Sequence, residues 1–106
     1  MQIKFADKEI EDAVCFCDFH GKYKKLKSAA GLKKDLFRVI NYLRAARNFE
    51  ELKFIKSLNY EHLKYDKVGL SSVRIGFKTK YRLIFSEDEF TITITLIEIS
   101  EHYGDK

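Results

Sequence analysis

The chain of 106 residues contains no proline and no apolar run long enough to cross a bilayer, which takes about eighteen residues. Its N-terminal stretch, MQIKFADKEIED, lacks the apolar core of a signal peptide. We therefore expect a cytoplasmic protein without a membrane partner. The sequence also lacks repeats, low-complexity segments and linker-like stretches, and its length predicts one domain over residues 1–106.

Cysteine is scarce: the chain contains two cysteines, Cys15 and Cys17. They lie two positions apart in a segment with helical periodicity, so they point to different sides and do not form a disulfide with each other. Together with His20 they offer three metal ligands, but this spacing matches no standard zinc pattern and a fourth ligand is missing. We predict a reduced, partly buried pair, and we expect neither a metal nor another cofactor.

Charge is distributed unevenly along a chain whose net charge is +4. Residues 22–34 contain six lysines and no acid, and residues 64–82 contain six cations against one acid, Asp66. Acidic residues dominate after position 86. Segregated positive charge favours a phosphate-bearing partner at one face of the molecule, whereas a solvated lysine-rich surface is the alternative explanation.

Hydrophobic periodicity predicts two helices between a short first strand and a C-terminal sheet. Residues 2–5 alternate as a strand, Asp7 follows as a helix cap, and His20 and Gly21 end or bend the first helix. The second helix starts at Leu32 and runs to residues 45–46. Two apolar stripes support these helices: Ile10, Ala13, Val14 and Cys17, then Leu32, Leu36, Val39, Ile40 and Leu43.

Three further strands are predicted in the C-terminal half, at residues 72–78, 80–85 and 90–100. The connection before them needs packing of its own, and its expected anchors are Leu52, Leu58 and Leu63. The predicted fold class is α+β with the order β-α-α-β-β-β. Two N-terminal helices are expected on one face of a mostly antiparallel sheet.

Four cations lie on the first two of these C-terminal strands: Arg74, Lys78, Lys80 and Arg82. Alternation directs the apolar neighbours toward the helices and the four cations toward the outer surface of the sheet. No acid follows them until Glu87. Arginine grips a phosphate through two N–H groups and lysine acts as a movable point charge, so we expect this face to bind phosphate.

The last predicted strand ends beside this surface, and its end carries the chemically versatile side chains Glu98, Ser100, His102 and Tyr103. RNA cleavage by the 2′-hydroxyl requires a base, cations for the phosphorane charge and an acid for the leaving 5′-oxygen. These residues provide each part. The alternative is structural, with Glu98 paired to a cation on the neighbouring strand and the other side chains in a fraying tail.

Three segments resemble the RelE/ParE superfamily of bacterial toxins, and within it the HigB group. LKKDLFRVINYLRAARNFEELK (32–53) resembles the second helix of that group. HLKYDKVGLSSVRIGFKTKYRLIF (62–85) resembles its LKGD..G..SIRI...YRL.F stretch, and ITLIEIS (94–100) falls where the family ends its last strand. The similarity covers nearly the whole chain and implies the RelE-like fold.

This resemblance implies a toxin of a type II toxin–antitoxin system that cleaves messenger RNA on the translating ribosome. The implied partners are a HigA-like antitoxin with a helix-turn-helix fold and, through the complex, operator DNA. It also implies that basic residues hold RNA phosphate and that a small group performs the chemistry. The former are Arg74, Lys78, Lys64 and Lys67, and the latter are Arg82, Lys80, Glu98, His102 and Tyr103.

The chain departs from the family pattern where Glu98, Ile99 and Ser100 replace Asp-Tyr-His. Glu98 preserves the acid, but the two residues after it cannot do the work of tyrosine and histidine. His102 and Tyr103 follow closely, near the place where other ribonucleases of the superfamily carry a histidine and an aromatic. The acid and the base stay unassigned among these residues. Two alternatives are a ParE-like inhibitor of DNA gyrase and a degenerate member that binds only antitoxin and operator DNA.

Overall fold

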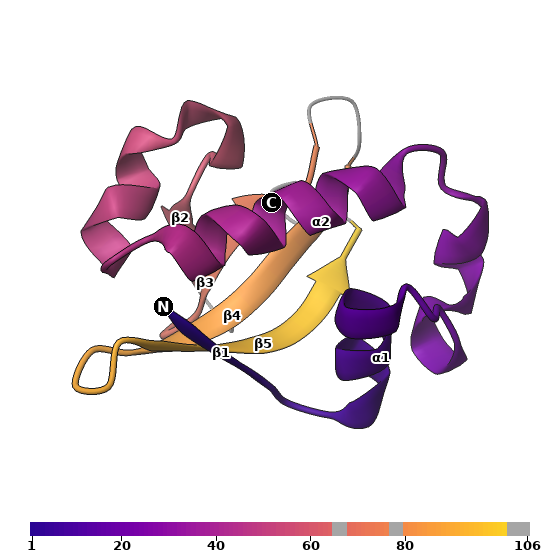
Figure 1. Cartoon of the computed structure of the whole chain (residues 1–106), viewed down its shortest axis with the longest axis horizontal. Coiled ribbons are helices and arrows are strands. Elements are labelled where there is room, and N and C mark those ends of the chain that lie inside the picture. The colour runs from indigo at the N-terminus through magenta and orange to yellow at the C-terminus, as the bar shows by residue number, and fades with distance from the viewer. Residues whose placement is uncertain (65–67, 77–79, 102–106) are drawn as a thin grey trace.

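The fold is built on a five-stranded sheet, seen in a computed structural model that describes residues 1–64, 68–76 and 80–101 (Figure 1). The strands lie in the order β1-β5-β4-β3-β2. β1 runs parallel to β5, and the other neighbouring pairs are antiparallel. Their bounds are β1 (Gln2–Phe5), β2 (Glu61–His62), β3 (Ser71–Arg74), β4 (Arg82–Asp88) and β5 (Thr93–Ser100).

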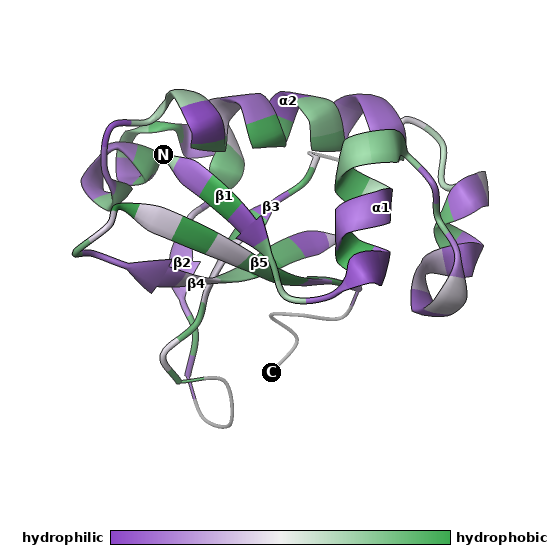
Figure 2. Cartoon of the chain, turned by 60° about the horizontal axis from the view of Figure 1, so that its bottom comes forward, coloured by the Kyte–Doolittle hydropathy of each residue, from purple (hydrophilic) through white to green (hydrophobic). Residues whose placement is uncertain are grey.

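Two α-helices, α1 (Lys8–Phe16) and α2 (Leu32–Ala45), pack with one face of the sheet to form the core. Figures 1 and 2 show α2 crossing over the sheet and α1 beside the end of β5. The expected α+β fold with helices on one face of a mostly antiparallel sheet is thereby confirmed. Three 3₁₀ helices complete the structure: η1 (Gly21–Ser28), η2 (Phe49–Phe54) and η3 (Lys56–Leu58). Within the described ranges, none of the helices has the length and apolarity needed to span a membrane.

The second α-helix matches its sequence prediction closely. It begins after Gly31, whose φ of 76° is a left-handed conformation that glycine adopts without strain. All five residues of the predicted apolar stripe are buried in the core. Packing of this stripe stabilises a helix of 14 residues, because intrinsic propensity alone is marginal at this length.

The first α-helix has the predicted cap but ends earlier than expected. Asp7 accepts a hydrogen bond from the backbone N–H of Ile10 at 3.0 Å. The helix stops at Phe16, and Cys17 has a φ of 54°, which turns the chain out of the helix. The prediction of a partly buried cysteine pair is therefore wrong, because Cys15 and Cys17 are both exposed.

The connection between α2 and β3 packs through the expected anchors, since Leu52, Leu58 and Leu63 are all buried. The sequence did not predict the short strand β2 within it. That strand pairs Glu61 with Ser72 and His62 with Ser71. Two residues are too few to show an alternating pattern, so periodicity does not reveal this strand.

A β-bulge in β5 changes which of its residues face the helices. Ile84 lies opposite Glu98. The next residue of β4, Phe85, lies opposite Leu96, so β5 contains one extra residue at this point. Strict alternation would turn Glu98 toward the core with Leu96. With the bulge, Ile99 joins the core and Glu98 lies on the other face, with its cross-strand partner.

Candidate functional site

The segment between the two α-helices forms one wall of a pocket at the end of the sheet. Gly21 begins η1 with a φ of 59°, and a Cβ at this position would lie 2.1 Å from a carboxylate oxygen of Glu9. Glycine therefore provides both the conformation and the space. Tyr23 is buried, and its hydroxyl accepts a hydrogen bond from the backbone N–H of Ile99 at 3.4 Å. This contact ties η1 to β5.

The pocket has a volume of about 310 Å³ and lies between η1, the start of β4 and the end of β5. Its basic side chains come from η1, whereas Glu98 and Ser100 come from β5. Cations and a carboxylate that can exchange protons are thus gathered at one place. The lining residues are Lys22, Tyr23, Lys25, Leu26, Tyr81, Glu98, Ile99, Ser100 and Glu101.

A carboxylate with two lysine partners lies at the rim of this pocket. The Glu101 oxygens lie 3.1 Å from Lys25 Nζ and 2.7 Å from Lys80 Nζ. Hydrogen bonds from Lys80 and Lys25 lower the pKa of Glu101 to about 2, and the bond to Glu101 raises the pKa of Lys80. Lys80 therefore lies at the rim of this pocket, where it has an acid partner that the sequence analysis did not predict.

Arg82 does not lie on an open cationic surface, which corrects the expectation from strand alternation. Its side chain is 8% exposed. Its Nε donates to Ser72 Oγ at 3.0 Å, and its Nη2 donates to the backbone carbonyl of Asn59 at 2.7 Å. Glu61 Oε2 lies 3.6 Å from Nη2. The guanidinium therefore joins β4 to β3 and to the segment before β2.

Of the other predicted site residues, some lie within the residues that the structure describes and the rest lie outside them. Arg74 is half-buried on β3, directly opposite Arg82, and Lys64 is exposed beyond β2. Tyr81 packs against the core and also lines the pocket. The remaining predicted residues, Lys67, Lys78, His102 and Tyr103, lie outside the residues that the structure describes.

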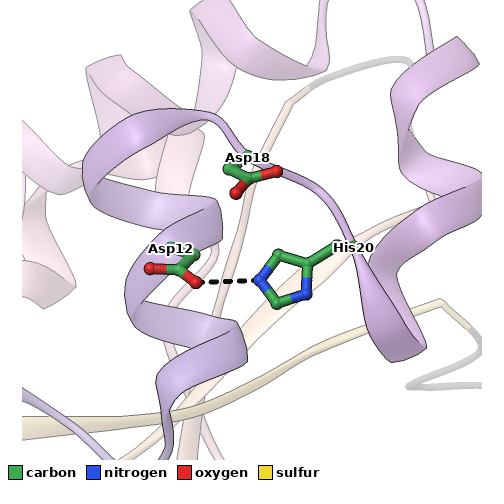
Figure 3. A group of neighbouring side chains, drawn as sticks. All are labelled: Asp12, Asp18 and His20. Carbon is green, nitrogen blue, oxygen red and sulfur yellow. Dashed lines mark hydrogen bonds and ion pairs between the residues drawn. The ribbon is translucent and has the colours of Figure 1, made fainter.

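A second group of titratable side chains lies on α1 and the turn after it (Figure 3). Asp12, Asp18 and His20 present ligand-type atoms within 4.8 Å of one another. His20 Nε2 lies 2.8 Å from one oxygen of Asp12, and Lys8 Nζ lies 3.1 Å from the other. Both oxygens of the Asp12 carboxylate therefore have a partner within the protein, and the group forms an ion-pair cluster.

Replacing His20 with glutamine is expected to lower stability at about pH 5 and to have little effect at about pH 9. The hydrogen bond to Asp12 raises the pKa of His20 above its ordinary 6.5, so folding favours the protonated ring. This stabilisation is complete below pH 6.5 and is lost as the pH rises through the folded-state pKa. The lowered pKa of Asp12 keeps its carboxylate charged down to below pH 3.8.

Urea unfolding of both proteins at the two pH values measures this difference. His62→Gln is the matched control, because the His62 ring contacts the hydroxyl of Ser71 rather than a carboxylate. An equal loss at both pH values for the His20 variant would contradict the ion-pair interpretation.

Comparisons with known proteins find likenesses among solved structures. No protein-family model matches the chain, and the search of curated proteins finds no match either. The YoeB/ParE toxin from Agrobacterium tumefaciens superposes with a TM-score of 0.61 at 16% identity, over 97% of this chain and 100% of that one. The YoeB dimer from Staphylococcus aureus gives a TM-score of 0.52 at 19% identity, over 97% and 98%.

A third structure is that of the heterotetrameric YoeB–YefM toxin–antitoxin complex from Staphylococcus aureus. It has a TM-score of 0.51 at 21% identity and covers 97% of this chain and 98% of that one. These likenesses extend over nearly the full length of each chain, although few residues are identical. The expected resemblance to the RelE/ParE superfamily is confirmed at the level of the fold, and the HigB-like subtype stays a prediction. The chain has the fold of the YoeB/ParE toxins.

Proposed function

We propose that this protein is the toxin of a type II toxin–antitoxin system and cleaves messenger RNA on the translating ribosome. The pocket beside Glu98 carries this proposal, because two lysines from η1 and this carboxylate near the end of β5 line the same cavity. The fold of the YoeB/ParE toxins supports the assignment as a toxin. Since the likeness includes a YoeB–YefM complex, we infer a cognate antitoxin partner, and operator DNA bound through that complex, in the cytoplasm.

The proposed reaction uses the 2′-hydroxyl of RNA as the nucleophile. A base removes its proton, the oxygen bonds to phosphorus, and the bond from phosphorus to the 5′-oxygen breaks as that oxygen receives a proton from an acid. We assign these proton transfers to Glu98 and His102, assisted by Tyr103, and the charge on the phosphorane to Lys80. Arg82 is assigned a positioning role, because its guanidinium is bonded within the sheet.

The RNA strand on either side of the reacting phosphate needs further cationic contacts. We assign these contacts to the basic residues that the resemblance implies, together with Lys22 of the pocket wall. Such contacts hold the strand without reading its sequence, because phosphate is the same at every nucleotide. The implied residues are Arg74, Lys64, Lys67 and Lys78.

Brief induction of the protein in a bacterium lacking the antitoxin is expected to stop growth and to create new transcript ends inside translated codons. The double variant Glu98→Gln, His102→Ala is expected to lower the cleavage rate at least about a hundredfold, because it removes both proposed proton-transfer groups. Sequencing of transcript 5′ ends measures the effect. Glu50→Gln is the control, since its carboxylate pairs with Lys53 on η2, outside the pocket lining.

Three outcomes contradict the proposal. Growth arrest with intact transcripts and altered plasmid supercoiling would favour a gyrase inhibitor of the ParE kind. An unaffected culture would favour a degenerate protein that binds only antitoxin and operator. Undiminished cleavage by the double variant would reject the assigned chemistry.

A further inference from the structure

The rim of the pocket contains an anion that belongs to the protein itself. Glu101 follows directly after β5 and connects two lysines from distant parts of the chain. Lys25 belongs to η1, and Lys80 precedes β4 by two residues. One carboxylate oxygen faces each ammonium group, at 3.1 Å and 2.7 Å. The rim of the pocket therefore has a preformed site for an anion with two oxygen atoms.

A phosphodiester has the features that this two-lysine site selects. Each phosphate of RNA carries one negative charge shared by two non-bridging oxygens, as a carboxylate does. Charge-assisted hydrogen bonds from lysine to either group have similar lengths, about 2.7–2.9 Å. The ammonium groups are also accessible, because the side chains of Lys25 and Lys80 are 74% and 62% exposed, whereas that of Glu101 is 19% exposed.

We propose that Glu101 occupies a phosphate-binding subsite in the free protein and that an RNA phosphodiester displaces it from Lys25 and Lys80. This inference rests on the proposed function, since it takes an RNA strand as the ligand of the same pocket. The subsite joins η1 to the segment before β4, and its members Lys25 and Glu101 line the same pocket as Glu98. A phosphate bound there lies at the rim of the pocket that contains the group that we assign to proton transfer.

Because RNA must displace Glu101, it binds more weakly than it would to Lys25 and Lys80 without this competing carboxylate. RNA binds only to the fraction of molecules in which Glu101 has left the lysines, so the apparent dissociation constant rises in inverse proportion to that fraction. Free RNA at low concentration then binds poorly. RNA presented beside the protein at a high effective concentration, as on a ribosome, overcomes the competition. Glu101 thereby restricts binding to presented RNA.

Replacing Glu101 with glutamine is expected to strengthen RNA binding by about tenfold, because the neutral amide competes weakly for the two ammonium groups. The probe is a fluorescein-labelled single-stranded RNA whose 2′-hydroxyls are methylated. This RNA can bind, but it has no 2′-hydroxyl to act as the nucleophile. Fluorescence anisotropy at fixed salt gives the dissociation constant. Lys80→Ala and Lys25→Ala are expected to weaken binding, and adding Lys80→Ala to the Glu101 variant is expected to remove its gain.

The matched control is again Glu50→Gln, which changes the net charge by the same amount and removes a carboxylate 3.3 Å from Lys53. Equal gains for the Glu50 and Glu101 variants would overturn the proposal, since they would reflect net charge alone. A second measurement follows the carboxyl carbon of Glu101 by NMR during acid titration. Bound RNA is expected to raise the pKa of Glu101 from about 2 toward its usual value, 4.5. An unchanged titration with saturating RNA would overturn the proposal as well.

The two proposals fail separately. If transcripts are cleaved in cells but the Glu101 and Glu50 variants bind RNA alike, the nuclease assignment stands and the subsite is wrong. If the Glu101 variant alone binds the unreactive RNA more tightly while cellular transcripts stay intact, the subsite stands and the nuclease assignment is wrong. Far-ultraviolet circular dichroism of each variant verifies that its fold is unchanged.

Discussion

Replacing Phe85 with alanine is expected to lower the free energy of unfolding by about 3–5 kcal/mol. Phe85 lies on β4 near the centre of the sheet and has no exposed surface. Its ring stacks on that of Tyr60, with centroids 6.3 Å apart and planes at 21°. Truncation removes the transfer free energy of the ring and leaves a cavity that the strands on either side cannot fill.

This loss is a large part of the total for a small domain, whose unfolding free energy is typically about 5–15 kcal/mol. Urea unfolding at neutral pH measures it. Phe90→Ala is the control, because Phe90 is fully exposed in the turn after β4 and should change stability by about 0.5 kcal/mol or less. Similar losses for the two variants would mean that Phe85 does not lie in the core.

Replacing Arg82 with alanine is expected to lower the free energy of unfolding by about 2–3 kcal/mol, because buried acceptors lose a charged donor. The carbonyl of Asn59 and the hydroxyl of Ser72 would lose the guanidinium as their partner. Glu61 is 42% exposed and remains solvated, so its lost attraction adds little. Thermal unfolding followed by circular dichroism, together with urea titration, gives the change.

Arg74→Ala provides a matched comparison, because Arg74 lies directly opposite Arg82 in the sheet. Among the described residues, Arg74 makes no side-chain hydrogen bond or ion pair, and its replacement should leave stability nearly unchanged while weakening RNA binding. Arg82→Ala should instead lower stability strongly and affect RNA binding less. If it unfolds like the parent protein but loses RNA cleavage, Arg82 contacts the phosphate and its positioning role is wrong.

The local parts of the fold were predictable from sequence. The stripe on α2 and the cap at Asp7 appeared where expected, because both depend on residues within three or four positions of each other. The alternation of Leu83 and Phe85 also identified β4 correctly. Such patterns report directly on one face of one element. They do not report which distant segment packs beside it.

The site depended on such distant contacts, and there the sequence analysis was incomplete. The segregated charge, including the lysines at 22–34, was interpreted as favouring a phosphate-bearing partner, but nothing local indicated that Lys25 and Lys80 share one carboxylate. The bulge in β5 changes the face of the sheet on which Glu98 lies. An alternating run of isoleucine and threonine does not reveal such a bulge. Arg82 follows the alternation of its strand, yet Asn59 and Ser72 enclose it.

The position of β5 in the sheet has a consequence for protein synthesis. This strand lies between β1 and β4, so β1, the first strand made by the ribosome, has no partner in the sheet until β5 pairs with it. It also provides Glu98 and Ser100 to the pocket. Chains emerge from the N-terminal side, and pairing between remote strands is slow. A nascent chain therefore has no complete pocket until β5 has been made and has paired with β4.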